Sequence, residues 1–175
     1  SIILIGHRDH DEVEGTSGEA PEAIHLIGSV EEALAVEVKR ADRVAVITQT
    51  TLSLDDTREI LEALRRRFPG LVTPPKDDIC YATHNRQNAV KQLAERVDLI
   101  LVLGSSNSSN ANRMCEVARE AGTKAFLIND FLDIEPAWLP SAGTIGVTAG
   151  ASTPEALVQD TVDHLRSMGS GQVEE

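Results

Sequence analysis

The run Asp98-Leu99-Ile100-Leu101-Val102-Leu103 is followed directly by Gly104-Ser105-Ser106-Asn107-Ser108-Ser109-Asn110, and this junction decides the fold. The first part is almost continuously apolar, which is typical of a parallel strand with both faces covered. The second part is a loop of hydroxyl and amide side chains, and a helical pattern that includes Met114 and Val117 follows it. The order strand, polar loop, helix predicts one repeat of an α/β sheet.

The same order recurs on both sides of this junction. We therefore predict an α/β protein of two consecutive small modules with mostly parallel sheets, at residues 1–76 and 77–168, and a flexible tail at 169–175. The boundary is placed in the connector 71–76, which contains the Pro74-Pro75 pair. The predicted strands are 2–5, 24–27, 43–48, 98–103, 125–128 and 144–148, and the most clearly delimited helices are 54–68, 85–97 and 154–168.

Helix-capping signals refine these elements. Ser53 precedes Asp56 at the spacing of a capping box, and Ser152 precedes Glu155 in the same way, with Pro154 in the first turn. A further helix is predicted to start after Ser29. Apolar residues at helical spacing are expected to face the core: Val30, Leu34 and Val38 after Ser29, and Ala89, Val90, Leu93 and Ala94 in helix 85–97.

Composition excludes several classes of function. The 175 residues are 41% hydrophobic and only 3% aromatic, so the core must be aliphatic. The net charge of -12 argues against nucleic acid and against an anionic membrane as the main partner, because both require basic patches. Two cysteines do not make a disulfide scaffold and indicate a reducing compartment. No signal peptide or membrane-spanning run is apparent.

Three loops share a chemistry suited to anions. Residues 48–53, 104–110 and 148–153 are each rich in Ser, Thr, Asn or Gln, and each lies between a predicted strand and a helix. Helix amino termini offer backbone N–H groups and a favourable dipole, so such loops can bind a phosphate or diphosphate without an arginine. The alternative for any single loop is helix capping alone. None of the three is a Walker or GxGxxG loop.

Two further stretches carry titratable or nucleophilic groups. In the polar loop predicted at residues 7–16, His10 and Glu12 could exchange protons, could bind zinc together with His7, or could simply be solvated. Cys80 is expected at the entrance of the helix predicted to open at Asn85, where a thiolate is favoured as a nucleophile or metal ligand. The alternative is a small buried apolar residue.

Five stretches, taken in order along the chain, carry a resemblance to a known family. The stretches are His10-Asp11-Glu12-Val13-Glu14-Gly15-Thr16, Thr48-Gln49-Thr50-Thr51-Leu52-Ser53, Asp77 to Thr83 with Asn85-Arg86-Gln87, Asn107 to Asn110 with Asn112-Arg113, and Thr148 to Pro154. They resemble the motif set of the 4-hydroxy-3-methylbut-2-enyl diphosphate reductases, the LytB-type iron–sulfur enzymes that end the methylerythritol phosphate route to isoprenoids. The resemblance covers nearly the whole chain.

The resemblance implies a three-module α/β trefoil around a [4Fe–4S] cluster that three cysteines hold. It implies reductive dehydroxylation of an allylic diphosphate to isopentenyl and dimethylallyl diphosphates, with ferredoxin or flavodoxin as electron donor, in the cytoplasm or a plastid stroma. Carried over by matching motif, Cys80 is a cluster ligand and Glu12 the proton donor, with Thr50 in its relay. The residues that hold the substrate are His10, Thr50, Thr51, Ser108, Ser109, Asn110 and Ser152.

The chain also departs from the family pattern. The first module and the start of the second have no counterpart, and two of the three cluster cysteines belong there. Cys115 is no replacement, since it falls within a helix between Met114 and Val117, where a buried structural role is expected. We therefore expect this chain to be a fragment that is inactive in isolation. The alternative function is a non-catalytic α/β protein that binds a diphosphate or a sugar phosphate through the same hydroxyl-rich loops.

Overall fold

The computed structural model describes residues 1–74, 78–169 and 171–174. These form two compact units, Ser1–Tyr81 and Ala82–Glu175. The boundary predicted between residues 76 and 77 lies outside the described residues, as do Asp77 of the cysteine motif and Ser170 and Glu175 of the predicted tail. In the described part of the chain, no helix combines the length and the apolar character that crossing a membrane requires.

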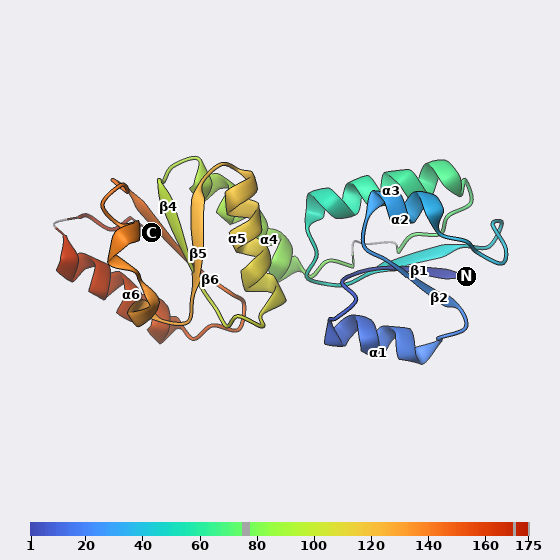
Figure 1. Cartoon of the computed structure of the whole chain (residues 1–175), viewed down its shortest axis with the longest axis horizontal. Coiled ribbons are helices and arrows are strands. Elements are labelled where there is room, and N and C mark those ends of the chain that lie inside the picture. Colours follow the sequence, from blue (N-terminus) through green and yellow to red (C-terminus); the bar gives the residue numbers. More distant parts are fainter. Residues whose placement is uncertain (75–77, 170, 175) are drawn as a thin grey trace. The chain divides into compact units, whose positions relative to one another are not determined.

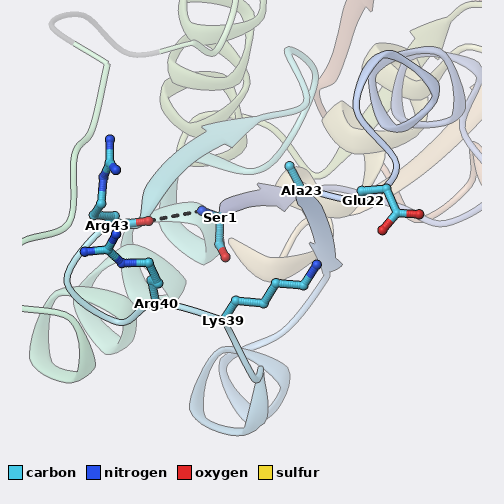
Figure 2. Close-up of a pocket in the computed structure, with 6 residues that line it drawn as sticks. All are labelled: Ser1, Glu22, Ala23, Lys39, Arg40 and Arg43. Carbon is cyan, nitrogen blue, oxygen red and sulfur yellow. Dashed lines mark hydrogen bonds between the residues drawn. The ribbon is translucent and has the colours of Figure 1, made fainter.

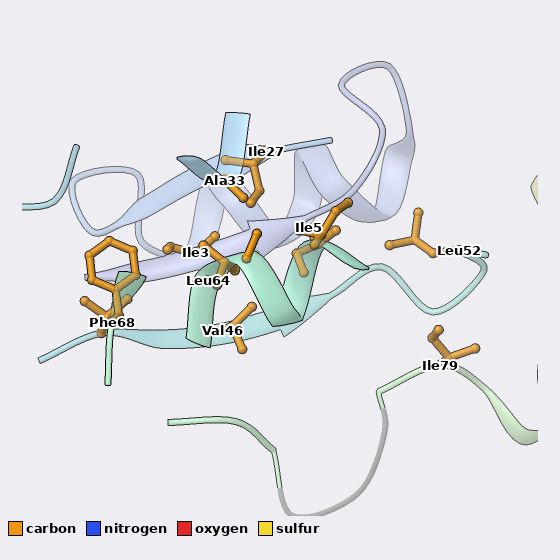
Figure 3. Close-up of a cluster of buried hydrophobic side chains, with 12 residues drawn as sticks. Ile3, Ile5, Ile27, Ala33, Val46, Leu52, Leu64, Phe68 and Ile79 are labelled. Carbon is orange, nitrogen blue, oxygen red and sulfur yellow. The ribbon is translucent and has the colours of Figure 1, made fainter. Parts of the chain in front are cut away.

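The first unit is a parallel sheet between helices. Its elements are β1 (Ile2–Ile5), α1 (Asp11–Glu19), β2 (Ile24–Ile27), α2 (Val30–Ala35), β3 (Ala45–Thr48) and α3 (Leu54–Arg67). The strand order is β2-β1-β3, all parallel. Helix α1 covers one face of the sheet, and α2 and α3 cover the other (Figure 1). Between the sheet and α3, Ile3, Val46 and Leu64 form the centre of an aliphatic core (Figure 3).

The second unit repeats this plan. Its elements are α4 (Tyr81–Ala94), β4 (Leu99–Leu103), α5 (Ser109–Glu120), β5 (Lys124–Ile128), the 3-10 turns η1 (Phe131–Asp133) and η2 (Pro136–Trp138), β6 (Ile145–Ala149) and α6 (Glu155–Met168). The strand order is β5-β4-β6, again all parallel. All five residues of β4 are buried, because one cluster with α4 and α5 and another with α6 cover its two faces. The predicted α/β class with parallel sheets is confirmed.

One helix, α1, is absent from the sequence prediction, and another, α4, begins earlier than predicted. Residues 7–16 are not a loop throughout, since α1 starts at Asp11. Only Val13 of α1 is buried, so the helix has almost no apolar stripe to reveal it. Helix α4 starts at Tyr81 rather than Asn85. It buries Thr83 and Gln87 in its first half, and these polar residues hide its core-facing side from a hydrophobic pattern.

Three side-chain predictions on the helices are wrong. Leu34 is 58% exposed, because α2 ends at Ala35 and buries Ala33 instead. Ala89 is exposed on α4, whereas Val90 and Ala94 are buried. Ser152 does not cap α6: the cap position is Pro154, which has no side chain that can accept a hydrogen bond. By contrast, the predicted Ser53 cap is confirmed, as Asp56 N–H donates to Ser53 Oγ at 3.2 Å.

Candidate functional site

In the first unit, Glu12 and Thr50 are joined by two hydrogen bonds. Thr50 N–H donates to Glu12 Oε1 and Thr50 Oγ1 donates to Glu12 Oε2, each at 2.9 Å. Glu12 is the second residue of α1, which follows β1, and Thr50 follows β3. Because β1 and β3 are adjacent and parallel, the segments that leave their carboxyl ends lie together. The geometry holds the half-buried carboxyl group of Glu12 in one orientation.

His10 caps the same helix. Its Nδ1 accepts a hydrogen bond from Glu12 N–H at 3.2 Å, so the ring is fixed beside the first turn of α1. The ring nitrogen thereby takes the place that a Ser or Asp oxygen usually occupies at a helix start. His10 and Glu12 are thus brought together by the helix itself, with Nε2 of His10 left as the ring's other polar atom.

Cys80 is linked to Thr50 as well. Cys80 N–H donates to the Thr50 carbonyl at 3.0 Å, so a single residue contacts both Glu12 and the cysteine. The Cys80 side chain is exposed and immediately precedes α4. An exposed thiol at this place is accessible to a metal ion or a reagent from solution.

Gln49 is a residue to which the sequence analysis assigned no role. It is 1% exposed, its Oε1 accepts from His7 N–H at 2.9 Å, and its Nε2 donates to Thr51 Oγ1 at 2.9 Å. Gln49 therefore ties the segment after β1 to the segment after β3, and it also holds the Thr51 hydroxyl group within its own segment. The sequence could have indicated Gln49 only by its position, because a long polar side chain immediately after a buried strand must find hydrogen-bond partners.

In the second unit, the first turn of α5 contains the other predicted site residues. Ser108 caps the helix, and its Oγ accepts from Ala111 N–H at 3.3 Å. Ser109 and Asn110 are the first two residues of α5, and Asn110 is only 8% exposed. Within the described residues, neither side-chain oxygen nor nitrogen of Asn110 has a hydrogen-bond partner. A buried amide without a protein partner is unusual in a folded protein, so the Asn110 side chain is available to an ordered water or to a polar ligand.

The loop that contains Ser152 lies against this turn. Gly150 N–H and Thr153 Oγ1 both donate to the Leu103 carbonyl at the end of β4, at 2.8 and 3.0 Å. A Cβ atom placed on Gly150 would lie 3.5 Å from Cβ of Ala111 in α5. Exposed Ser152 therefore belongs to the same edge of the second sheet as Ser108, Ser109 and Asn110.

The metal-binding capacity of the described residues is small. They contain no group of three or more His, Cys, Asp or Glu side chains that could hold a metal ion, so the zinc arrangement of His7, His10 and Glu12 is not formed there. Cys115 is buried in α5 as predicted, and burial raises the pKa of its thiol to about 11. Cys80 fits a cluster as one ligand, and the described part of the chain does not complete the set.

A hollow at the opposite edge of the first sheet is unrelated to these residues. It lies at the amino ends of the strands, where the Ser1 amine donates to the Arg43 carbonyl at 3.1 Å (Figure 2). The predicted site residues of this unit instead follow the carboxyl ends of β1 and β3. The residues that line the hollow are Ser1, Glu22, Ala23, Lys39, Arg40 and Arg43.

The sequence of this chain matches a known protein family and curated relatives. The family model described as LytB protein matches residues 1–166. Over 173 residues the chain is 53% identical to the 4-hydroxy-3-methylbut-2-enyl diphosphate reductases of Klebsiella pneumoniae subsp. pneumoniae and Salmonella newport, covering 97% of this chain and 55% of each relative. The chain therefore spans about half the length of these relatives.

A solved structure agrees with the fold. The E-1-hydroxy-2-methyl-but-2-enyl-4-diphosphate reductase from Plasmodium falciparum matches with a TM-score of 0.89 and 38% sequence identity. The match covers 94% of this chain and 52% of that protein. The similarity thus extends over both units, although the other protein is almost twice as long.

Proposed function

This chain belongs to the LytB protein family, and we propose that it forms part of a 4-hydroxy-3-methylbut-2-enyl diphosphate reductase. The proposed reaction removes the allylic hydroxyl group. A C–O bond breaks and a C–H bond forms, so the substrate, two electrons and two protons give water and isopentenyl or dimethylallyl diphosphate. This reaction ends the methylerythritol phosphate route to isoprenoids. We propose this activity for a longer protein, in which this chain is joined to the part of the reductase sequence that it does not span.

The observation that carries the proposal is the set of contacts made by Thr50. Its N–H and Oγ1 hold the Glu12 carboxyl group, and its carbonyl accepts from Cys80 N–H. A reductive dehydroxylation needs a proton donor that is held in place and a ligand for the electron-transfer group. One backbone segment here supports a candidate for each.

Glu12 is assigned the proton transfer, with Thr50 as its relay. Thr50 Oγ1 is both a donor and an acceptor, so after Glu12 has protonated the leaving hydroxyl group it can pass its proton to Glu12 Oε2 along the existing 2.9 Å contact while it accepts a proton from solvent water. The backbone hydrogen bond to Oε1 fixes the carboxyl group while the proton moves. His10, Thr50 and Thr51 are also assigned to substrate binding, His10 through the ring nitrogen that does not cap α1.

The second unit is assigned the diphosphate. The first turn of a 12-residue helix provides N–H groups and a positive dipole end for an anion. The buried amide nitrogen of Asn110 can donate a further hydrogen bond, which would satisfy a group that has no partner among the described residues. The hydroxyl groups of Ser108, Ser109 and Ser152 add donors without adding charge.

The proposed cofactor is a [4Fe–4S] cluster with Cys80 as one ligand. When bound, such a cluster would supply electrons one at a time, and two such transfers would provide the two electrons that the dehydroxylation consumes. The external donor is proposed to be ferredoxin or flavodoxin, and the location the cytoplasm or a plastid stroma, where such soluble donors occur. Since the described residues provide one suitable cysteine, we expect the isolated chain not to retain a complete cluster.

The test uses two samples. The 175-residue chain is reconstituted anaerobically with iron and sulfide, and iron, sulfide and turnover are measured; we expect less than one cluster per chain and no turnover. The same chain joined to the missing portion of a reductase relative is expected to bind a cluster and to turn over. A stoichiometric cluster with turnover in the isolated chain would overturn the fragment hypothesis.

The alternative is a non-catalytic protein that binds a diphosphate or a sugar phosphate. The unpartnered Asn110 side chain at the start of α5 favours this as a second candidate, because it requires an anion but no redox chemistry. Cys80→Ser in the joined protein separates the two candidates. Under the reductase proposal it abolishes colour and turnover, whereas under the binding proposal it changes neither colour nor the affinity for diphosphate.

A further inference from the structure

Residues on both sides of the undescribed stretch 75–77 bond to the edge of β3 that does not face β1. This strand pairs with β1 on one side only, since the sheet order is β2-β1-β3. On its other side, Val72 pairs with it as a parallel strand would: Val46 N–H donates to the Val72 carbonyl and Val72 N–H donates to the Val44 carbonyl, both at 2.9 Å. Val72 therefore lies beside β3 where a fourth parallel strand of the sheet would lie.

Further along the same edge, a side chain takes the place of backbone. Thr48 N–H donates to Asp78 Oδ2 at 3.1 Å, where a regular parallel strand would offer a carbonyl oxygen. Two residues later the backbone pairing resumes, as Cys80 N–H donates to the Thr50 carbonyl at 3.0 Å. Asp78 thus supplies the acceptor that keeps the Cys80 segment aligned with β3.

Ile79 anchors the segment from the other side. It is 9% exposed and belongs to the same hydrophobic cluster as Leu52 and Ile60 (Figure 3). Three consecutive residues are therefore attached to the first unit in three ways: a carboxylate to a backbone N–H, an apolar side chain to the core, and a backbone N–H to a carbonyl. The Cys80 side chain is exposed, and the contacts of Asp78, Ile79 and the Cys80 N–H hold the segment that leads to it.

We infer that Asp78 is a positioning residue for Cys80. Its carboxylate holds the segment on β3, and Thr50, which contacts both the segment and Glu12, sets the cysteine in register with the carboxyl group. The functional meaning rests on the proposed role of Cys80 as a cluster ligand, but the positioning itself is a property of this chain. Asp78 touches no reacting group, so it acts through Cys80 alone.

The test measures local opening at Cys80 by amide hydrogen exchange, in the ¹⁵N-labelled 175-residue chain. A hydrogen bond to a charged acceptor stabilises the closed form of a segment more than a neutral hydrogen bond does. We therefore expect Asp78→Ala to speed amide exchange at Cys80 roughly 10- to 100-fold. Asp78→Asn keeps an acceptor oxygen at the same place and should stay within about threefold of the parent chain. Exchange at Leu4, in the centre of the sheet, should not change in either variant.

Asp98→Ala is the matched control. Asp98 Oδ2 also accepts from backbone N–H groups where a loop joins a strand, those of Gly143 and Thr144 at 2.8 and 2.9 Å, but it lies in the second unit. We expect it to speed exchange at those two amides and to leave Cys80 unchanged.

Three results would overturn the inference. The first is unchanged exchange at Cys80 in Asp78→Ala. The second is an Asp78→Asn variant as open as Asp78→Ala, since the accepted hydrogen bond would then not be the cause. The third is equal loss of protection at Leu4, which would make Asp78 a general support of the first unit. None of these measurements needs turnover, so a failed positioning inference is distinguishable from a failed reductase proposal, which Cys80→Ser tests in the joined protein.

Discussion

The two units place a different polar residue at the same position of the same scaffold. In each, a glycine follows the central strand, and its N–H donates to the carbonyl at the end of the neighbouring strand at 2.9 Å: Gly6 to Ile27 and Gly104 to Ile128. Four residues after each glycine stands the cap of the next helix, His10 in one unit and Ser108 in the other. The equivalence follows from the hydrogen bonds and needs no sequence similarity.

In both units the residue after the central strand has no room for a side chain. A Cβ atom on Gly6 would come within 2.5 Å of Val13 Cγ2, and one on Gly104 within 2.5 Å of the Ala111 Cβ. Val13 and Ala111 are both the third residue of the helix that follows. Each helix therefore packs directly against the end of its strand, and any larger residue would push the first turn away.

The difference lies one residue earlier, at the second position of each helix. Glu12 of α1 has both carboxyl oxygens bonded to Thr50, whereas the side chain of Asn110 in α5 has no partner among the described residues. An internally satisfied acid suits a group that must hold and move a proton. A buried amide without partners suits a group that awaits a ligand. The same backbone position can thus serve proton transfer in one unit and anion binding in the other.

The largest expected effect separates these two roles in the joined, active protein. Glu12→Gln should lower kcat about 10²- to 10⁴-fold, because it removes the proposed proton donor and leaves the proposed binding groups in place. Asn110→Ala should instead raise KM roughly 10- to 150-fold, because it removes hydrogen bonds to a charged ligand. Steady-state kinetics measure both. Glu14→Gln, at an exposed position of α1, is the control and should change neither constant. The comparison would fail if Glu12→Gln changed mainly KM and Asn110→Ala changed mainly kcat.

A smaller effect concerns stability without ligand, and it should have opposite signs in the two units. Glu12→Leu leaves Thr50 N–H without its acceptor and should lower the free energy of unfolding by about 1–3 kcal/mol. Asn110→Leu replaces an unsatisfied buried amide with an apolar side chain and should raise it by about 1 kcal/mol. Urea unfolding can be followed by Trp138 fluorescence in the second unit and by amide exchange in the first.

Asn112→Leu is the control for the second unit. The Asn112 amide nitrogen donates to the carbonyls of Ser106 and Ser108, at 2.8 and 3.0 Å, so its loss should destabilise. If Asn110→Leu destabilises to the same extent, the amide of Asn110 is satisfied in solution without a ligand, and the contrast with Glu12 disappears.

The smallest effect distinguishes the cysteines by pH. Burial raises the pKa of Cys115 to about 11, above its ordinary value of 9.0, so the folded chain retains this proton when the unfolded chain has lost it. The contribution of Cys115 to the free energy of unfolding is therefore complete below pH 9 and decreases as the pH rises towards 11.

A thiol reagent at pH 8 should modify exposed Cys80 quickly and Cys115 only after urea unfolding. Two fast thiols in the folded chain would contradict the burial of Cys115.

The sequence predicted the framework well where pattern and physics coincide. The five buried residues of β4 are apolar without interruption, and α3 has both a Ser53 cap and a regular apolar stripe. It missed α1 because a helix that buries only Val13 has no hydrophobic period to detect. It placed the start of α4 four residues late, because Thr83 and Gln87 are polar residues that face the interior.

The candidate site was predictable as a set of residue types but not as a set of contacts. Hydroxyl-rich loops after strands are compatible with anion binding and also with helix capping alone, and the resemblance of the motifs implies which residues to test. Neither shows that Thr50 bonds to Glu12 and Cys80, because these residues are 38 and 30 positions away from it. Gln49 and Asp78 were missed for the same reason, since their partners come from other segments.

The sequence by itself thus determined the alternation of strands and helices, the aliphatic core and the kinds of chemical group at the ends of the strands. Local residue order is sufficient for these, because hydrophobic period, caps and breakers act over a few residues. Only the tertiary structure decided that Glu12 has hydrogen-bond partners and that Asn110 has none among the described residues, and that a carboxylate from Asp78 accepts a hydrogen bond at the edge of β3. Those outcomes depend on which segments a parallel sheet brings side by side, and hydrogen-bond satisfaction is a property of that assembled neighbourhood.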